Sequence, residues 1–141
     1  MSNMMTLKAL LLNAMSDLIT TYGLAIIEVS DSEVLLKART FTIDVFMDKE
    51  SVDMVYFDTR YKPMKGYNIT RFLLNRRRDR LTFSANTPEP ASYSDFIEGQ
   101  LNSLIQHIRS AGLDILSGAD DWMKSYSWPT VQAQGSAAAL I

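Results

Sequence analysis

The chain has 141 residues and no cysteine, which excludes a thiolate nucleophile, a disulfide and a cysteine-type zinc site. Its hydrophobic content of 47% and charged content of 21% are ordinary for one globular domain and exclude wholesale disorder. No apolar run approaches the roughly 20 residues of a membrane span, and no secretion signal is recognisable. We therefore expect a cytoplasmic protein with a packed core.

An amphipathic helix is predicted first, over residues 4–22, because its apolar residues recur at helical spacing up to Gly23. From residue 24 to residue 60 the apolar period changes to two, and three short turns divide this stretch into four strands. Two-residue turns would pair apolar side chains on one face throughout and so predict an antiparallel meander. The predicted pairs are Val29 with Val34, Ile27 with Leu36, Leu36 with Ile43, Val34 with Val45, Met47 with Val52, and Val45 with Met54.

Helices dominate the rest of the chain. After a loop around Gly66, a second helix is predicted with Asn68 as its N-cap and the run Arg76-Arg77-Arg78 at its end. Residues 81–84 are predicted as a short strand. A third helix opens at serine 92 or 94 and ends before Gly112, and short helical turns follow it.

The predicted fold class is α+β: an N-terminal helix, a four-stranded antiparallel meander, and two to four helices packed on the sheet. Residues 1–128 form one domain in this interpretation. Residues 129–141 are rich in Gln, Gly, Ser and Ala, and we expect them to form a flexible C-terminal tail.

Catalytic and metal-binding signatures are not recognisable. The single histidine, His107, falls within the apolar stripe of the third helix, and its position is explained by an ordinary surface or boundary residue. The adjacent pair Asp120-Asp121 would point in different directions on a helix and make a poor chelate. We therefore expect no enzyme activity, no metal and no cofactor.

Acidic and aromatic residues alternate on the second face of the predicted sheet. Asp44 and Phe46 lie on one strand, with Asp53 and Phe57 on the next. Asp48 is predicted on the same strand face as Asp44, with Asp53 near them. A carboxylate cluster of this kind can do acid–base work or hold Mg²⁺, but no phosphate-binding loop accompanies it. A solvated strand face explains the pattern most simply, and binding of a partner explains the interleaved aromatic residues.

Charge is segregated along the chain. Residues 60–80 contain eight basic residues and one acidic residue, a net charge of +7, whereas the remainder carries −9. The segment includes Arg76, Arg77 and Arg78, which could contact phosphates, an acidic partner or the protein's own acidic strands. A sequence pI near 5.3 argues against nucleic acid, because most of the surface would repel a polyanion.

Trp122, Tyr126 and Trp128 form an aromatic cluster late in the chain. Trp122 is a candidate anchor for a partner, since Trp is favoured at binding hot spots. The simpler interpretation is that the cluster closes one end of the core.

The order of the predicted helices and strands resembles that of a known class of proteins. A leading helix ending at Tyr22-Gly23, a short-turn meander, and a closing helix followed by residues 112–118 and Trp122 resemble small immunity proteins of bacterial toxin systems. The likeness spans about residues 5–126 and implies a cytosolic inhibitor that binds a cognate toxin. Type III secretion chaperones are similar in size and acidity, but usually interrupt their strands with a helix.

The sequence therefore predicts a non-catalytic protein that binds another protein, with an immunity-type inhibitor as its expected form. The alternatives are a secretion-type chaperone, and a nucleic-acid-binding module that uses residues 60–80. A homodimer through the mixed sheet face is a further arrangement consistent with the pattern. The expected partner-binding residues are Asp44, Phe46, Asp53, Phe57, Arg76, Arg77, Arg78 and Trp122.

Overall fold

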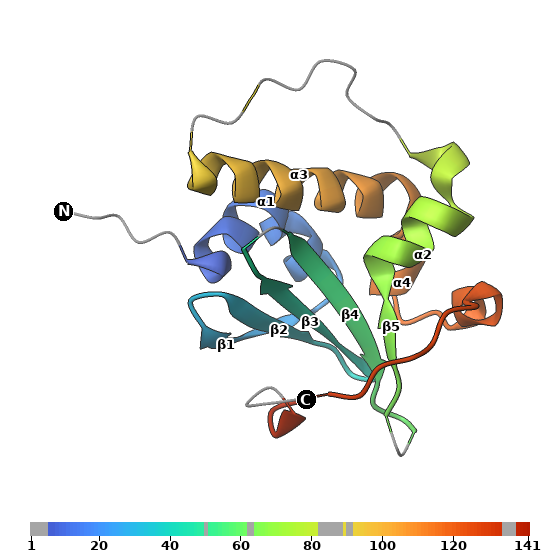
Figure 1. Cartoon of the computed structure of the whole chain (residues 1–141). Helices are drawn as coiled ribbons and strands as arrows, with labels where there is room; N and C mark the ends of the chain where they lie inside the picture. The colour runs from blue at the N-terminus through green and yellow to red at the C-terminus, as the bar shows by residue number, and fades with distance from the viewer. Residues whose placement is uncertain (1–5, 50, 62–63, 82–88, 90–91, 134–137) are drawn as a thin grey trace.

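A computed structural model describes residues 6–49, 51–61, 64–81, 89, 92–133 and 138–141 of the chain. It has the predicted α+β class, with an N-terminal helix, an antiparallel sheet and then further helices (Figure 1). In the described part of the chain, no helix combines the length and apolar character needed to cross a membrane. The predicted strand at residues 81–84 lies outside the described residues, apart from Leu81.

Helix α1 (Leu7–Thr21) ends close to the predicted residue 22, but it begins at Leu7 rather than at the predicted residue 4, because Thr6 is extended and forms the N-cap. The Thr6 side chain caps the helix by accepting a hydrogen bond from the Ala9 N–H at 3.2 Å. Gly23 follows with a φ of 63°, a left-handed conformation that favours glycine and ends the helix. The buried side of α1 packs against α3 and the first two strands.

The sheet has five strands rather than the predicted four. In chain order they are β1 (Ala25–Ser30), β2 (Glu33–Lys37), β3 (Phe41–Met47), β4 (Val52–Asp58) and β5 (Gly66–Asn68), and neighbours in sequence are neighbours in the sheet. The added strand, β5, falls where a loop around Gly66 was predicted. Three residues are too few to display a period of two, and pairing with β4 defines this strand.

Register is confirmed for two hairpins and wrong for the first. Between β2 and β3, and between β3 and β4, all four predicted apolar pairs occur. Between β1 and β2, however, Ile26 pairs with Leu36 and Glu28 with Val34, one residue away from the prediction. An irregularity between Glu28 and Ser30 adds a residue to β1, so Ile26 faces the core in place of Ile27.

The helices after the sheet start where their capping residues predict. Asn68 caps α2 by accepting from the Arg71 N–H at 2.9 Å, and Ser92 caps α3 by accepting from the Asp95 N–H at 3.1 Å. The described elements are α2 (Ile69–Arg76), a 3₁₀ turn η1 (Arg78–Arg80), α3 (Tyr93–Ala111), α4 (Leu113–Leu116) and a second 3₁₀ turn η2 (Asp121–Ser125).

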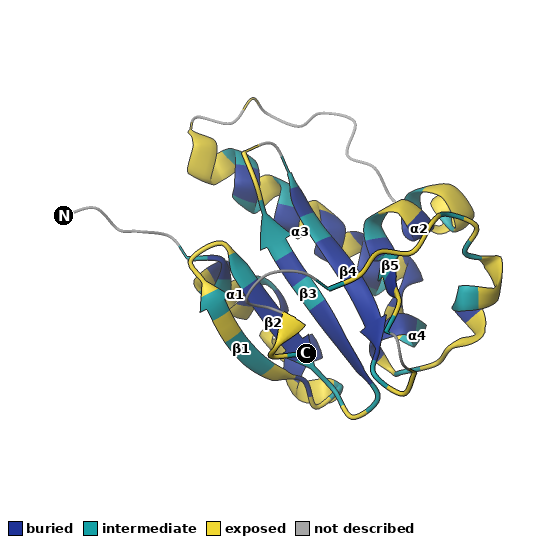
Figure 2. Cartoon of the chain, turned by 60° about the horizontal axis from the view of Figure 1, so that its bottom comes forward, coloured by how far each residue is buried: buried dark blue, intermediate teal, exposed yellow. Residues whose placement is uncertain are grey.

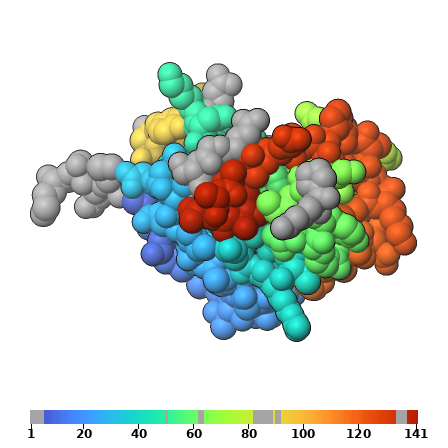
Figure 3. Space-filling view, turned by 90° about the horizontal axis from the view of Figure 1, so that it is seen from below, coloured from blue at the N-terminus to red at the C-terminus, as the bar shows by residue number. Residues whose placement is uncertain are grey.

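All three long helices, α1, α2 and α3, lie on the same side of the sheet (Figure 1). The core fills the space between them and the strands, where buried residues concentrate in Figure 2. We call the opposite side of the sheet the open face. Seen from below, the C-terminal residues lie across this face (Figure 3).

Trp122, in η2, lies inside the core with only 2% of its surface exposed. Its ring makes edge contacts with Tyr56, Tyr67 and Phe72, with centroids 5.1, 5.6 and 5.1 Å away. Such contacts stabilise a core beyond the area they bury. The simpler sequence interpretation, in which Trp122 closes one end of the core, is therefore the one that the packing supports.

Replacing Trp122 by Ala should reduce the free energy of unfolding by about 3–5 kcal/mol, because it removes the largest buried side chain. Urea denaturation followed by circular dichroism measures this loss. The matched control is Trp128→Ala, which removes a half-buried ring stacked with Arg76 and should cost on the order of 1 kcal/mol. Equal losses for the two variants would contradict this placement of Trp122.

Candidate functional site

The open face brings together the four residues that the strand pattern predicted on one face. In the β3–β4 ladder, Asp44 pairs with Val55, Phe46 with Asp53, and Thr42 with Phe57. Side chains alternate along a strand, and the intervening residues of β3 and β4 belong to the core. Asp44, Phe46, Asp53 and Phe57 therefore share the face turned away from the helices.

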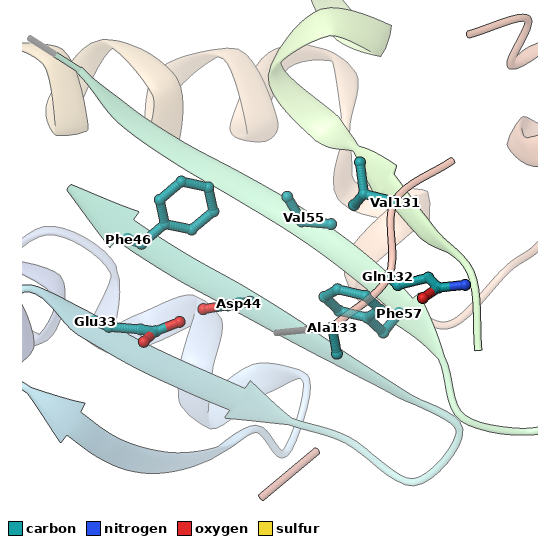
Figure 4. Close-up of a pocket in the computed structure, with 8 residues that line it drawn as sticks. All are labelled: Glu33, Asp44, Phe46, Val55, Phe57, Val131, Gln132 and Ala133. Carbon is teal, nitrogen blue, oxygen red and sulfur yellow. The ribbon is translucent and has the colours of Figure 1, made fainter. Parts of the chain in front are cut away.

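A groove of about 330 Å³ runs over this face. The sheet contributes residues from three adjacent strands, and residues 131–133 of the C-terminal segment form another wall (Figure 4). The groove is lined by Glu33, Asp44, Phe46, Val55, Phe57, Val131, Gln132 and Ala133. Two acidic side chains thus lie in a mainly apolar depression.

The groove residues differ in how accessible they are. Phe46 is half-buried, as the sequence pattern suggested, whereas Phe57 is only 2% exposed. Val55 and Leu35 on the same face are also buried, although α1, α2 and α3 lie on the other side of the sheet. The C-terminal segment accounts for part of this burial, because the Val131 side chain lies in the same groove as Val55 and Phe57. Phe57 is therefore part of the floor of the groove rather than an exposed contact residue.

The C-terminal segment meets the sheet at the outer edge of β5. Gly66 and Val131 form an antiparallel bridge with two backbone hydrogen bonds, of 2.7 Å and 3.0 Å. Farther along, the Lys37 Nζ donates to the Leu140 carbonyl oxygen at 2.9 Å. The predicted flexibility of residues 129–141 is not tested by these contacts and stays a prediction. They nevertheless give the described part of the segment a definite place on the open face.

Glu33 and Asp44 form a pair of facing carboxyl groups in the groove. They occupy diagonal positions on β2 and β3, and their side chains point toward each other in Figure 4. Burial, and after it the neighbouring Glu33 carboxyl group, together raise the pKa of Asp44 from 3.8 to about 7. Among the described residues, neither carboxyl group has an ion-pair partner.

Asp53 lies on the open face but does not line the groove. It pairs across the sheet with Phe46, and burial raises the pKa of its carboxyl group. The predicted cluster of Asp44, Asp48 and Asp53 is divided, because Asp48 is the acidic neighbour that also raises the pKa of Asp53, whereas Glu33 is the acidic neighbour of Asp44. Asp53 is an acidic residue beyond Phe46 on the same face.

The basic segment is partly neutralised by acidic residues elsewhere in the chain. The Arg60 guanidinium makes two hydrogen bonds to the Asp58 carboxylate, at 3.0 and 2.7 Å, and lowers the pKa of Asp58. A longer contact of 3.3 Å joins Arg60 to Asp120. Arg77 pairs in the same two-pronged way with Asp114, with one contact at 2.8 Å. The +7 segment of the sequence is therefore not a free +7 surface.

The Arg76-Arg77-Arg78 run divides into separate environments. Arg76 is exposed, donates to the Ser127 hydroxyl at 2.7 Å and lies over the Trp128 ring. Arg77 is nearly buried, with 11% of its side chain exposed, and also donates to the Ala111 carbonyl oxygen at 2.6 Å. Arg78 is exposed on η1. Neither this run nor Trp122 lines the groove on the open face.

The described residues contain no group of three or more His, Cys, Asp or Glu residues placed to hold a metal ion. His107 is on α3 and only 7% exposed, more buried than a boundary residue, and burial lowers its pKa. The groove offers two carboxyl groups, aromatic rings and an apolar floor. That combination suits recognition of a positively charged group.

Sequence reasoning missed two components of the groove. Glu33 could have been found from the predicted β2–β3 register, because that register already places it diagonally from Asp44. The wall formed by residues 131–133 had no such signal. Small and uncharged residues after Pro129 do not reveal which strand they will contact.

Comparison of the chain with protein-family models, with curated proteins and with solved structures finds no match.

Asp44→Asn should stabilise the protein at pH 8 and lose that advantage toward pH 4. Between pH 4 and pH 7 the unfolded chain releases the Asp44 proton while the folded chain keeps it, so wild-type stability falls as pH rises. Above pH 7 the loss is complete. Asn does not ionise, and the difference between variant and wild type should therefore grow from pH 4 to 7 and then level off.

Thermal denaturation at pH 4, 5, 6, 7 and 8 provides the measurement. Asp121→Asn is the matched control, because this carboxylate is 88% exposed and should give no comparable gain. A difference for Asp44→Asn that stayed constant across the series would contradict the burial of an ionisable Asp44.

Proposed function

We propose that this chain is a non-catalytic protein that binds another protein through the open face of its sheet. The main observation that supports this proposal is the groove in which Glu33 and Asp44 face each other beside Phe46. Among the described residues, neither carboxyl group has a basic residue that neutralises it. Its natural counterpart is a protein surface that presents a Lys or Arg side chain. Carboxylates would pair with the cation, and the aromatic ring would pack along its stem.

The electrostatics of Asp44 favour a binding role. A carboxyl group whose charged form is disfavoured by burial lowers stability at neutral pH, and perturbed groups of this kind concentrate at functional sites. A bound cation would relieve that penalty by favouring the charged form. Protein binding therefore explains a feature that the fold alone does not require.

The specific form that we propose is an immunity-type inhibitor that neutralises a cognate bacterial toxin in the cytoplasm. Support for this form comes from the layout: a leading helix, a short-turn meander and a closing helix followed by the buried Trp122. A secretion chaperone is less well supported, because strands β1 to β5 follow one another without an intervening helix. Nucleic-acid binding is weakened by the internal pairing of Arg60 and Arg77.

The test is a binding measurement with the protein encoded beside this gene, by isothermal titration calorimetry at neutral pH, together with inhibition of that protein's toxic activity. Asp44→Ala and Phe46→Ala should each weaken the complex on the order of 10- to 100-fold, because residues at the centre of an interface carry most of the binding energy. Asp121→Ala on η2 is the control and should leave affinity unchanged.

Several results would contradict the proposal. One is an affinity that none of the groove variants alters. Another is recovery of nucleic acid alone from cells, in a form released by high salt, since this would favour the basic segment as the binding site.

A further inference from the structure

The outer edge of β5 is occupied by the chain's own C-terminal residues. Both backbone groups of Gly66 that point outward bond to Val131. Two residues on, the Asn68 N–H donates to the Tyr126 hydroxyl at 3.0 Å. The Val131 backbone and the Tyr126 hydroxyl group therefore take the positions at which an added strand would bond to this edge.

Close packing accompanies these bonds. A Cβ atom built on Gly66 would lie 2.7 Å from Val131 Cγ2, 2.7 Å from Phe57 Cε1 and 2.8 Å from Val55 Cγ1. Phe57 and Val55 of the neighbouring strand β4 exclude a side chain at residue 66 by themselves, and Val131 occupies the remaining space beside this glycine. The edge is shaped to receive an extended segment that carries an apolar residue at the position of Val131.

Residues 129–133 complement the apolar part of the groove but carry no charge that would complement its two carboxyl groups. Val131 lies with Val55 and Phe57, but residues 129–133 are uncharged and contribute nothing to neutralise Glu33 or Asp44. The C-terminal segment also buries little of its apolar surface against the sheet, because Val131 is 48% exposed and Leu140 39% exposed. An extended segment with a basic residue would satisfy both parts of the groove.

We propose that the partner binds by adding an extended segment to the outer edge of β5, displacing residues 129–133 and placing a Lys or Arg side chain where Ala133 stands. Side chains alternate along a strand, so the residue two places after the one at Val131 falls on the same side, over the groove. The partner's backbone forms hydrogen bonds to Gly66, and the carboxyl groups of Glu33 and Asp44 bind its basic side chain. This proposal rests on the protein-binding function proposed above.

The preference of Glu33 and Asp44 for a basic residue at position 133 can be tested in the full-length protein. Ala133→Arg should raise the melting temperature at pH 8 by about 2–4 °C, the shift expected for a modest ion pair in a domain of this size. The gain should shrink toward pH 5, where Asp44 is protonated, and disappear in an Asp44→Asn, Glu33→Gln background. Ala133→Met is the uncharged control of similar length. A gain independent of pH and of the two acids would overturn the selection.

Displacement is tested with a synthetic peptide probe. The peptide has the sequence of residues 126–133 with fluorescein at its N-terminus, and a second version carries the change Ala133→Arg. Full-length Val131→Pro, which lacks the N–H that bonds to Gly66, should bind the Arg peptide at least about tenfold more tightly than wild type does in fluorescence anisotropy. Val131→Ala keeps that N–H but loses the packing against Val55 and Phe57, and should therefore show a smaller gain in affinity than Val131→Pro.

The outcomes separate the two proposals. If folded Val131→Pro binds neither peptide, or binds both equally, residues 129–133 only cover the edge of β5. The proposal that a partner adds a strand there then fails. The proposed function would still stand if the neighbouring gene's product binds through Asp44 and Phe46. If the peptides bind as expected but that product does not, the edge is a binding site and the choice of partner is wrong.

Discussion

One-sided coverage of the sheet is the constraint on which the candidate site depends. All three long helices pack on one face, so the alternating side chains of every strand divide between a core and a second face. That second face is not simply polar, since it contains Leu35, Val55 and Phe57, which are nearly inaccessible to solvent. Burying them without a second layer of helices requires another cover, and the C-terminal segment provides it in part.

The groove combines features that oppose each other energetically. Apolar walls favour neutral groups, yet Glu33 and Asp44 place two carboxyl groups among them. Burial and the nearby Glu33 carboxyl group together raise the pKa of Asp44 to about 7. Two other partly buried acids are paired with arginines, Asp58 with Arg60 and Asp114 with Arg77. The contrast suggests that the groove's acids are left for an external cation, which is the basis of the proposed function.

Charge along the sequence and charge on the folded surface are different quantities. Residues 60–80 are strongly basic as a segment, but folding brings Asp114 and Asp120 to two of their arginines from more than 30 residues away. Arg76 meanwhile contacts Ser127 and the Trp128 ring. The separation between a basic segment and an acidic remainder, which follows from counting charges in the sequence, is therefore partly cancelled in the folded protein. This weakens the case for nucleic-acid binding.

Local patterns in the sequence determined the fold class, the N-caps of α2 and α3, the glycine after α1 and the confirmed registers of β2, β3 and β4, because these depend on periodicity and on residues close in the chain. They also placed Asp44 and Phe46 on one face. Tertiary structure alone decided the irregularity in β1, the short strand β5 and the position of residues 131–133 on the open face. A one-residue bulge and an uncharged segment leave no periodic trace, since their positions are set by contacts with distant strands.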